Sequence, residues 1–124
     1  SISYKNLVEY SPNGIVILKD NKLVYSNKKF LKYLRVNFED IKTLSFIDLI
    51  AKEDIEDYKN TSNEINFGSE IPFLEIKLIN PKSKESIELE YKMSPLNYNG
   101  EQVLQIIFKD ISVEKKLLQE KLLI

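Results

Sequence analysis

Alternation of apolar and polar side chains along the second half of the chain is the feature that most restricts the fold. The pattern occupies residues 74–78 and again 87–93, and an apolar run follows at 103–108. Strict alternation is typical of strands with one buried face. Turn-forming residues at 80–84 and 97–100 separate the runs, and such short connections join antiparallel neighbours. The pattern therefore predicts a three-stranded antiparallel meander, with its last strand covered on both faces.

The first half of the chain predicts a further pair of strands. Residues 15–18 and 23–25 are rich in β-branched and aromatic side chains, and an Asp-Asn pair lies between them. Two such runs around this pair predict a β-hairpin. Apolar spacing before the hairpin predicts a short helix over 3–10.

Short helices are predicted between the hairpin and the meander. Asn27 is placed to cap a helix over 28–34. Asn37 with Asp40, and Ser45 with Asp48, have the spacing of capping boxes. A longer helix with acidic residues in its first turn follows, and Gly68 is expected to end it. The order of elements predicts an α+β domain, in which five antiparallel strands form one sheet and the helices pack on one face.

Composition excludes several classes of protein. The 124 residues contain no Cys and no His, so thiolate zinc sites, thiol nucleophiles and histidine-dependent mechanisms are excluded, and we expect no metal site. The net charge is −1 and Arg35 is the single arginine, which argues against nucleic acid as a partner. The apolar runs are shorter than the roughly 20 residues of a membrane span, so we expect no membrane insertion by this segment and a cytoplasmic location.

Three segments at fixed separations resemble a known family. They are residues 4–15, residues 24–30, and residues 110–116, the last beginning with Asp110, Ile111 and Ser112. Together they resemble a PAS domain, the sensory module of prokaryotic signalling proteins, and the likeness covers nearly the whole chain. The resemblance implies a five-stranded antiparallel sheet whose inner face and helices enclose a pocket. In the family, that pocket holds a flavin, a haem, a small acid or nothing.

The residues present restrict the cofactor that the resemblance allows. Lys28 and Lys29 follow Asn27, where the light-sensing flavin branch needs a cysteine, so a cysteinyl flavin is excluded. The haem-binding branch uses an axial histidine, which this chain lacks. The cofactor is therefore unknown: a non-covalent flavin, a small apolar ligand and an empty pocket all stay open.

Five side chains are candidates for lining that pocket. Asn27 either contacts a ligand or only caps the helix after it, and the cap is sufficient to explain it. Four polar or soft side chains are predicted to face inward, where a ligand or a neighbouring group would satisfy them: Tyr58, Tyr91, Met93 and Gln105. The alternative is a pocket filled by its own side chains.

Asp110 and Ser112 resemble the family's exit signal, in which a threonine stands where this chain has Ser112. We expect Ser112 to be an N-cap and the pair to relay a signal from the last strand. The alternative is a cap without a switching role. Apolar stripes in residues 113–124 predict the start of a coiled coil, since a helix this short must dimerise or pack back on the sheet.

The predicted organisation is a PAS sensor over residues 1–112, with an N-terminal helix or cap at 1–13, and a linker helix from 113. The predicted function is a sensory and dimerisation module of a histidine kinase or cyclic-di-nucleotide signalling protein, with its output domain in the same chain, acting as a homodimer. The alternative is a ligand-free interaction domain. An enzyme using Glu75, Glu88, Glu90 or Tyr91 is disfavoured, because charges that alternate along a strand belong on its solvent face.

Overall fold

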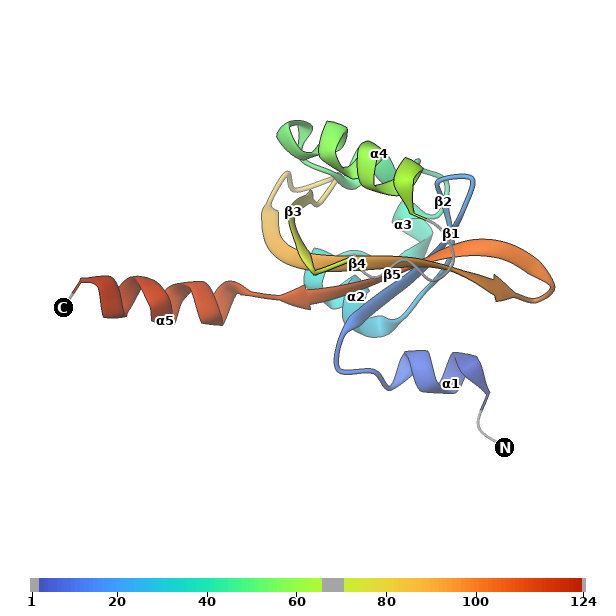
Figure 1. Cartoon of the computed structure of the whole chain (residues 1–124), viewed down its shortest axis with the longest axis horizontal. Helices are drawn as coiled ribbons and strands as arrows, with labels where there is room; N and C mark the ends of the chain where they lie inside the picture. The colour runs from blue at the N-terminus through green and yellow to red at the C-terminus, as the bar shows by residue number, and fades with distance from the viewer. Residues whose placement is uncertain (1–2, 66–70, 124) are drawn as a thin grey trace.

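The computed structural model describes residues 3–65 and 71–123, and its sheet is flanked by helices (Figure 1). The five strands form one antiparallel sheet in the order β2-β1-β5-β4-β3. The predicted α+β fold and its five-stranded sheet are therefore confirmed. The elements in chain order are α1 (Tyr4–Glu9), β1 (Gly14–Lys19), β2 (Lys22–Ser26), α2 (Lys28–Leu34), α3 (Phe38–Ile41), the 3-10 turns η1 (Phe46–Leu49) and η2 (Lys52–Asp54), α4 (Ile55–Glu64), β3 (Leu74–Ile79), β4 (Ser86–Tyr98), β5 (Glu101–Asp110) and α5 (Ser112–Leu122).

Tight turns set the register of the two hairpins that the sequence predicts most clearly. Asp20 and Asn21 between β1 and β2 have φ of 49° and 67°. Asn99 and Gly100 between β4 and β5 have φ of 51° and 80°. Positive φ at both central residues is the geometry that matches the twist of antiparallel strands, and Asn, Asp and Gly adopt it at least cost.

The predicted helix starts are confirmed by their hydrogen bonds. Helix α2 begins after Asn27, whose side chain accepts a hydrogen bond from the backbone N–H of Phe30. The Asp40 carboxylate accepts from the backbone N–H of Asn37, and the Asp48 carboxylate from that of Ser45, each at 3.2 Å. These are the predicted capping boxes. The predicted end of α4 at Gly68 lies outside the described residues.

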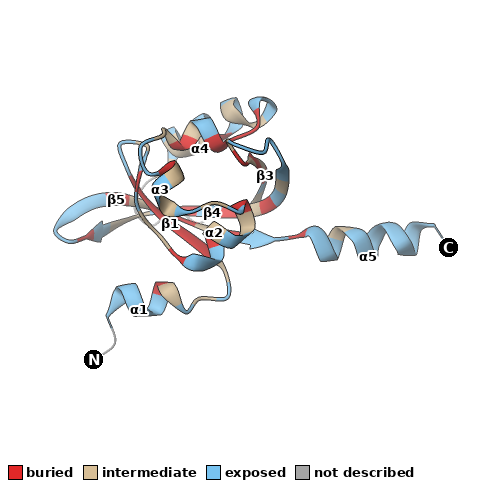
Figure 2. Ribbon diagram, turned by 180° about the vertical axis from the view of Figure 1, so that it is seen from behind, coloured by how far each residue is buried: buried red, intermediate tan, exposed pale blue. Residues whose placement is uncertain are grey.

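The two faces of the sheet are buried differently. One face carries the main core, to which α2, α3, η1 and α4 contribute (Figures 1 and 2). The opposite face carries a smaller cluster of Ile17, Tyr98 and Val103. Helix α1 covers part of this face, since the ring of Tyr4 packs edge-on against Tyr98 with centroids 5.9 Å apart.

Helix α5 leaves the domain at the end of β5 and projects away from the sheet (Figures 1 and 2). Its apolar side chains are exposed: Val113 69%, Leu117 53%, Leu118 59% and Leu122 76%. The alternative that this helix packs back on the sheet is therefore wrong for this structure. Ile124, which the predicted stripe includes, lies outside the described residues.

Candidate functional site

Asn27 is fully buried and forms hydrogen bonds to three different elements. Its Oδ1 accepts hydrogen bonds from the backbone N–H groups of Ile15 at 2.9 Å and Phe30 at 3.0 Å. Its Nδ2 donates to the carbonyl oxygens of Val8 at 2.8 Å and Asn13 at 2.9 Å. These four bonds use both amide hydrogens and the carbonyl oxygen. Asn27 thus joins the end of α1, the start of β1 and the start of α2, and its capping role accounts for its burial.

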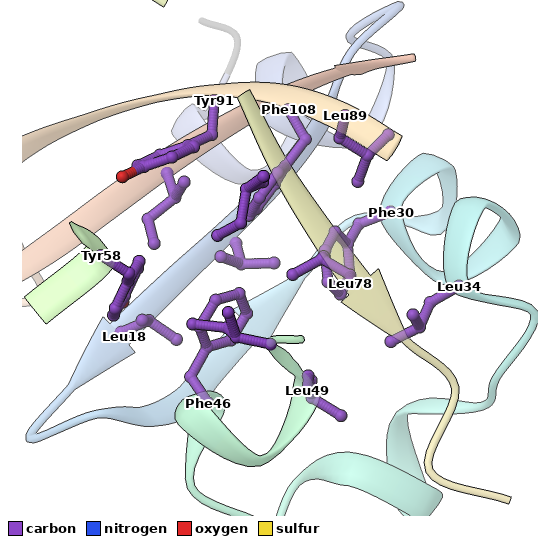
Figure 3. Packing of buried hydrophobic residues seen from close by; sticks show 14 of the residues in the cluster. Leu18, Phe30, Leu34, Phe46, Leu49, Tyr58, Leu78, Leu89, Tyr91 and Phe108 are labelled. Atoms are coloured by element: carbon purple, nitrogen blue, oxygen red, sulfur yellow. The ribbon is translucent and has the colours of Figure 1, made fainter. Parts of the chain in front are cut away.

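Three of the candidate pocket residues face the main core, as the sequence predicts. Tyr58 on α4 and Tyr91 and Met93 on β4 are all buried there. Figure 3 shows the Tyr58 and Tyr91 side chains among the rings of the core. The ring centroids of Tyr58 and Tyr91 are 6.1 Å apart, and those of Phe46 and Tyr58 are 5.8 Å apart. Such spacings are typical of packed aromatic pairs.

The core rings occupy the region between the sheet and the helices. The Phe108 ring on β5 packs against Phe30 of α2 at 5.1 Å, Phe46 of η1 at 6.1 Å and Tyr91 at 6.3 Å. The interior where the resemblance places a pocket therefore holds a cluster of five rings, contributed by Phe30, Phe46, Tyr58, Tyr91 and Phe108.

Gln105 does not face this core, and the prediction that it points inward is wrong. Its neighbours Ile106 and Leu104 contact the main core, so Gln105 lies on the opposite face of β5. There its Oε1 accepts a hydrogen bond from the hydroxyl of Tyr4 on α1. Gln105 thus holds α1 against the sheet and is separated from Tyr58 and Tyr91 by the sheet itself.

An open cleft of about 550 Å³ lies beside Tyr58, at the end of the molecule where β1 meets β2. Its apolar lining includes Leu18, Ile47 and Leu104, and its polar lining includes Lys59 and Ser62, among other residues. Tyr58 is the member of the predicted set that lines it. A ligand bound in this cleft would therefore contact α4 directly and β4 only through Pro95.

Burial changes the acid–base properties of the two core tyrosines. Burial raises the pKa of Tyr58, and the nearby phenol of Tyr91 raises it further. Burial also raises the pKa of Tyr91, although a hydrogen bond with Thr61 acts in the opposite direction. Both phenols therefore stay neutral near pH 7 and act there as hydrogen-bonding groups, and not as bases.

Asp110 and Ser112 are hydrogen-bonded to each other at the junction of β5 and α5, which we call the exit. The Oδ1 of Asp110 accepts from the backbone N–H of Ser112 at 2.9 Å and from its hydroxyl at 2.6 Å. The prediction that Ser112 caps the helix is wrong. Ser112 is the first residue of α5, and the cap position is Ile111, whose side chain is buried. The capping acceptor is the Asp110 carboxylate, which favours the positive end of a helix.

Two further structural positions are not indicated by sequence reasoning. Asn80 is buried, and its Nδ2 donates to the carbonyl oxygens of Leu34 at 2.9 Å and Arg35 at 3.1 Å. This bonding ties the end of α2 to the β3–β4 turn. An Asn before Pro81 signals only a turn, so its distant partners give no sequence signal.

Tyr33 is the second such residue. Its ring lies over Gly14, where an added Cβ would come within 3.0 Å of the Tyr33 ring and 3.1 Å of the Phe30 Cα. Burial raises the pKa of Tyr33, and the charge of Asp110 raises it further. Tyr33 thus connects α2, β1 and the exit. A side chain at position 14 would therefore force the Tyr33 ring or the Phe30 backbone to shift.

The glutamates considered for an enzyme lie where the sequence predicts. Glu75 and Glu88 are exposed and Glu90 is partly exposed. Glu75 and Glu88 form ion pairs with Lys115 of α5, and no cluster of three or more metal-ligating side chains occurs within residues 3–65 and 71–123. Within the same ranges, no helix combines the length and apolar character needed to span a membrane.

Comparison with known proteins gives one curated relative. Over 102 residues the chain is 30% identical to the RNA polymerase sigma factor SigI1 of Acetivibrio thermocellus. The match covers 82% of this chain and 35% of that protein, so the chain spans about a third of the length of the curated relative it matches. No family model matches the chain.

Solved structures match the fold over most of the chain. The PAS domain of an HTR-like protein from Haloarcula marismortui is 22% identical, with a TM-score of 0.71 over 85% of this chain and 86% of that one. A PAS domain of a two-component sensor histidine kinase is 12% identical, with a TM-score of 0.66 over 84% and 89%. Both matches extend over the sheet and helices on which the site is built, at TM-scores that show a common fold. The chain therefore has the PAS fold.

Proposed function

We propose that the chain is the sensory and dimerisation module of a prokaryotic signalling protein and is not itself catalytic. A change in ligand occupancy or dimer packing would move β5, and the exit would pass that movement to α5. The observation that carries the proposal is the double hydrogen bond from Ser112 to the Asp110 carboxylate, because it joins the last residue of β5 to the first residue of α5. Two packings that differ by only a few kcal/mol would be sufficient for switching.

The exposed stripe of α5 supports a homodimer. Leu117, Leu118 and Leu122 are all more than half exposed, and a single helix of this length is marginal in water. Pairing with the same helix of a second copy, as the first turns of a coiled coil, would bury these side chains. The proposed output domain lies in the same polypeptide. The fold shared with a histidine kinase's PAS domain supports a kinase output, and the sigma-factor relative offers transcription control as another.

Ligand binding at the core is part of the proposal, with Tyr58, Tyr91 and Met93 as contacts. Asn27 and Gln105 would act only indirectly, since their side chains are bonded elsewhere. A cytoplasmic location stays a prediction from the sequence. The second candidate function is a ligand-free interaction domain, which the packed aromatic cluster favours. Native mass spectrometry and the visible absorbance of the purified protein separate the two, because bound small molecules would argue for the sensor.

The exit is tested in the full-length protein. Asp110→Ala and Ser112→Ala should each uncouple the output activity from its stimulus, whereas Ser112→Thr keeps the hydroxyl and should retain regulation. Output activity with and without the stimulus is the measurement. Unchanged regulation in both alanine variants would refute the relay.

A further inference from the structure

We infer that a basic groove on α2 binds an acidic, amphipathic segment of a partner protein. The groove of about 660 Å³ lies between α2, α3 and the β3–β4 turn. Among the described residues that line it, four are basic and one is acidic, although the whole chain has a net charge of −1. The basic residues are Lys28, Lys32, Arg35 and Lys82, and the acidic one is Asp40.

The floor of the groove is apolar because of the way α2 ends. The N–H of Val36 donates to the carbonyl of Leu31 at 3.1 Å, and that of Arg35 donates to Lys32 at 3.2 Å. This pair of bonds is a Schellman motif, which brings the side chains of Leu31 and Val36 together. Both are half-buried and line the groove. An apolar floor with a cationic rim fits an amphipathic segment whose polar face is acidic.

Arg35 occupies a backbone position that a glycine would normally take. Its φ is 58°, in the left-handed region that is unfavourable for most residues with a side chain. The Schellman motif needs this conformation and does not need an arginine. Residues that break a local rule are often placed for function. The only arginine of the chain therefore stands at the rim, where a guanidinium can hold a carboxylate with two parallel hydrogen bonds.

Ion pairs within the chain still leave the basic rim of the groove able to bind a partner. Arg35 lies 3.3 Å from the Glu85 carboxylate, with side chains 79% and 65% exposed, and such surface pairs are easily exchanged. Lys82 pairs with Asp40 at 2.8 Å and lowers the pKa of that carboxyl. Arg35 also lines a pocket of about 280 Å³ with Asp110 and Ser112. Arg35 is therefore shared between the groove and the pocket at the start of α5.

The observations favour a protein over other anions. None of the described lining residues is aromatic, so the groove offers no platform for stacking bases. Leu31 and Val36 are recessed, whereas membrane binding needs protruding apolar side chains. The occupant is therefore an acidic segment of another protein, and this inference does not depend on the identity of any ligand in the core.

The test uses the 124-residue chain and a labelled synthetic peptide of about four helical turns, with leucines on one face and glutamates on the other. We expect fluorescence anisotropy to report binding that weakens with salt. Arg35→Gly and Lys32→Glu should each weaken it about fivefold, and Arg35→Lys by less, because the charge remains. Lys52→Glu, at an exposed lysine outside the groove lining, is the matched control.

Arg35→Gly keeps the fold intact, since glycine is favoured at that φ, so lost binding cannot be assigned to unfolding. Equal affinity in all variants would overturn the inference. The inference would also be overturned if the chain bound anionic vesicles or single-stranded RNA more tightly than the peptide, and if the Arg35 and Lys32 variants lost that binding. A peptide of the same composition with its leucines and glutamates scrambled should bind more weakly, and equal binding would remove the role of the apolar floor.

Discussion

The ammonium group of Lys115 on α5 lies 2.6 Å from the carboxylate of Glu88 on β4 and 3.5 Å from that of Glu75 on β3. These ion pairs join the outgoing helix to two strands that are not its chain neighbours. Glu88 raises the pKa of Lys115, and Lys115 lowers the pKa of Glu88. The orientation of α5 is therefore set by two features, the Asp110–Ser112 hydrogen bonds and this charge cluster.

Lys115→Met should let α5 sample a wider range of directions. The chain has no cysteine, so cysteines introduced at Ser83 and Gln119 can be spin-labelled without interference. We expect the distribution of distances between the two labels to broaden in Lys115→Met. We expect the same broadening without this substitution at high salt, because salt screens exposed ion pairs. Lys116→Met, one residue along, should leave the distribution narrow. Identical distributions for both variants would show that the ion pairs do not hold the helix.

The same pairs define a pH window. The attraction by which Glu88 holds α5 is present at neutral pH and is lost as the pH falls through the lowered pKa of Glu88. The contribution of Lys115 is lost only as the pH rises through its raised pKa. We therefore expect the broadening at strongly acidic pH, and not between pH 6 and pH 9.

Asn27→Ala should destabilise the domain by about 3 kcal/mol or more, because it leaves buried backbone donors and acceptors unpaired. Urea denaturation followed by circular dichroism measures the change in the free energy of unfolding. Asn63→Ala, at an exposed asparagine of α4, is the control and should change stability by less than about 0.5 kcal/mol. A loss under 1 kcal/mol at Asn27 would mean that water replaces its side chain.

Gly14→Ala should destabilise by about 1–3 kcal/mol, since its methyl group would press on the Tyr33 ring and the Phe30 backbone. Gly100→Ala offers the comparison, because there the cost is backbone strain alone: φ is 80° and no atom beyond the two neighbouring residues lies within 4 Å of the added Cβ. Thermal unfolding of both variants measures the two costs. Combining Gly14→Ala with Tyr33→Ala should cost less than the sum of the single changes, and strict additivity would argue against contact with the Tyr33 ring.

Tyr58 should make stability fall at alkaline pH. Burial raises its pKa in the folded protein, whereas an unfolded tyrosine ionises near pH 10. The folded state therefore loses stability as the pH rises above about 10, by about 1.4 kcal/mol at pH 11 for a phenol that stays neutral. Urea melts at pH 9 and pH 11 should show a smaller loss in Tyr58→Phe than in the unmutated chain. Met93→Leu, also in the core, should keep the full loss.

Local signals made most elements predictable. The turn at Asn99 and Gly100 and the start of α2 at Asn27 depend on hydrogen bonds within a few residues, and the sequence contains both partners. Alternation placed Tyr91 and Met93 correctly because their strand has one polar face. The prediction for Gln105 was wrong for the opposite reason. Strand β5 is apolar on both faces, so alternation could not indicate the face on which Gln105 lies. Its pairing with Ile17, far away in the sequence, decides that.

Long-range partners account for the rest of the candidate site. Asn80 binds the end of α2 about 45 residues earlier, and Tyr33 meets Gly14 and Asp110 only in the folded chain. At the exit, the sequence identified Asp110 and Ser112 as a pair but assigned the capping role to the wrong member. A carboxylate and a hydroxyl two residues apart are both able to accept from the helix, and only the backbone direction after Ile111 selects Asp110.

The cluster of five aromatic rings has a consequence for the rate of any binding inside the domain. A molecule could enter the core only while a ring such as Tyr58 or Phe46 had rotated out of place. Its apparent affinity would then be reduced by the fraction of time that the open arrangement exists. Its arrival would follow the frequency of ring displacement and would stop increasing with concentration. A saturating association rate is thus the kinetic signature of a ligand inside this core, whereas a rate that stays proportional to concentration would indicate the open cleft beside Tyr58.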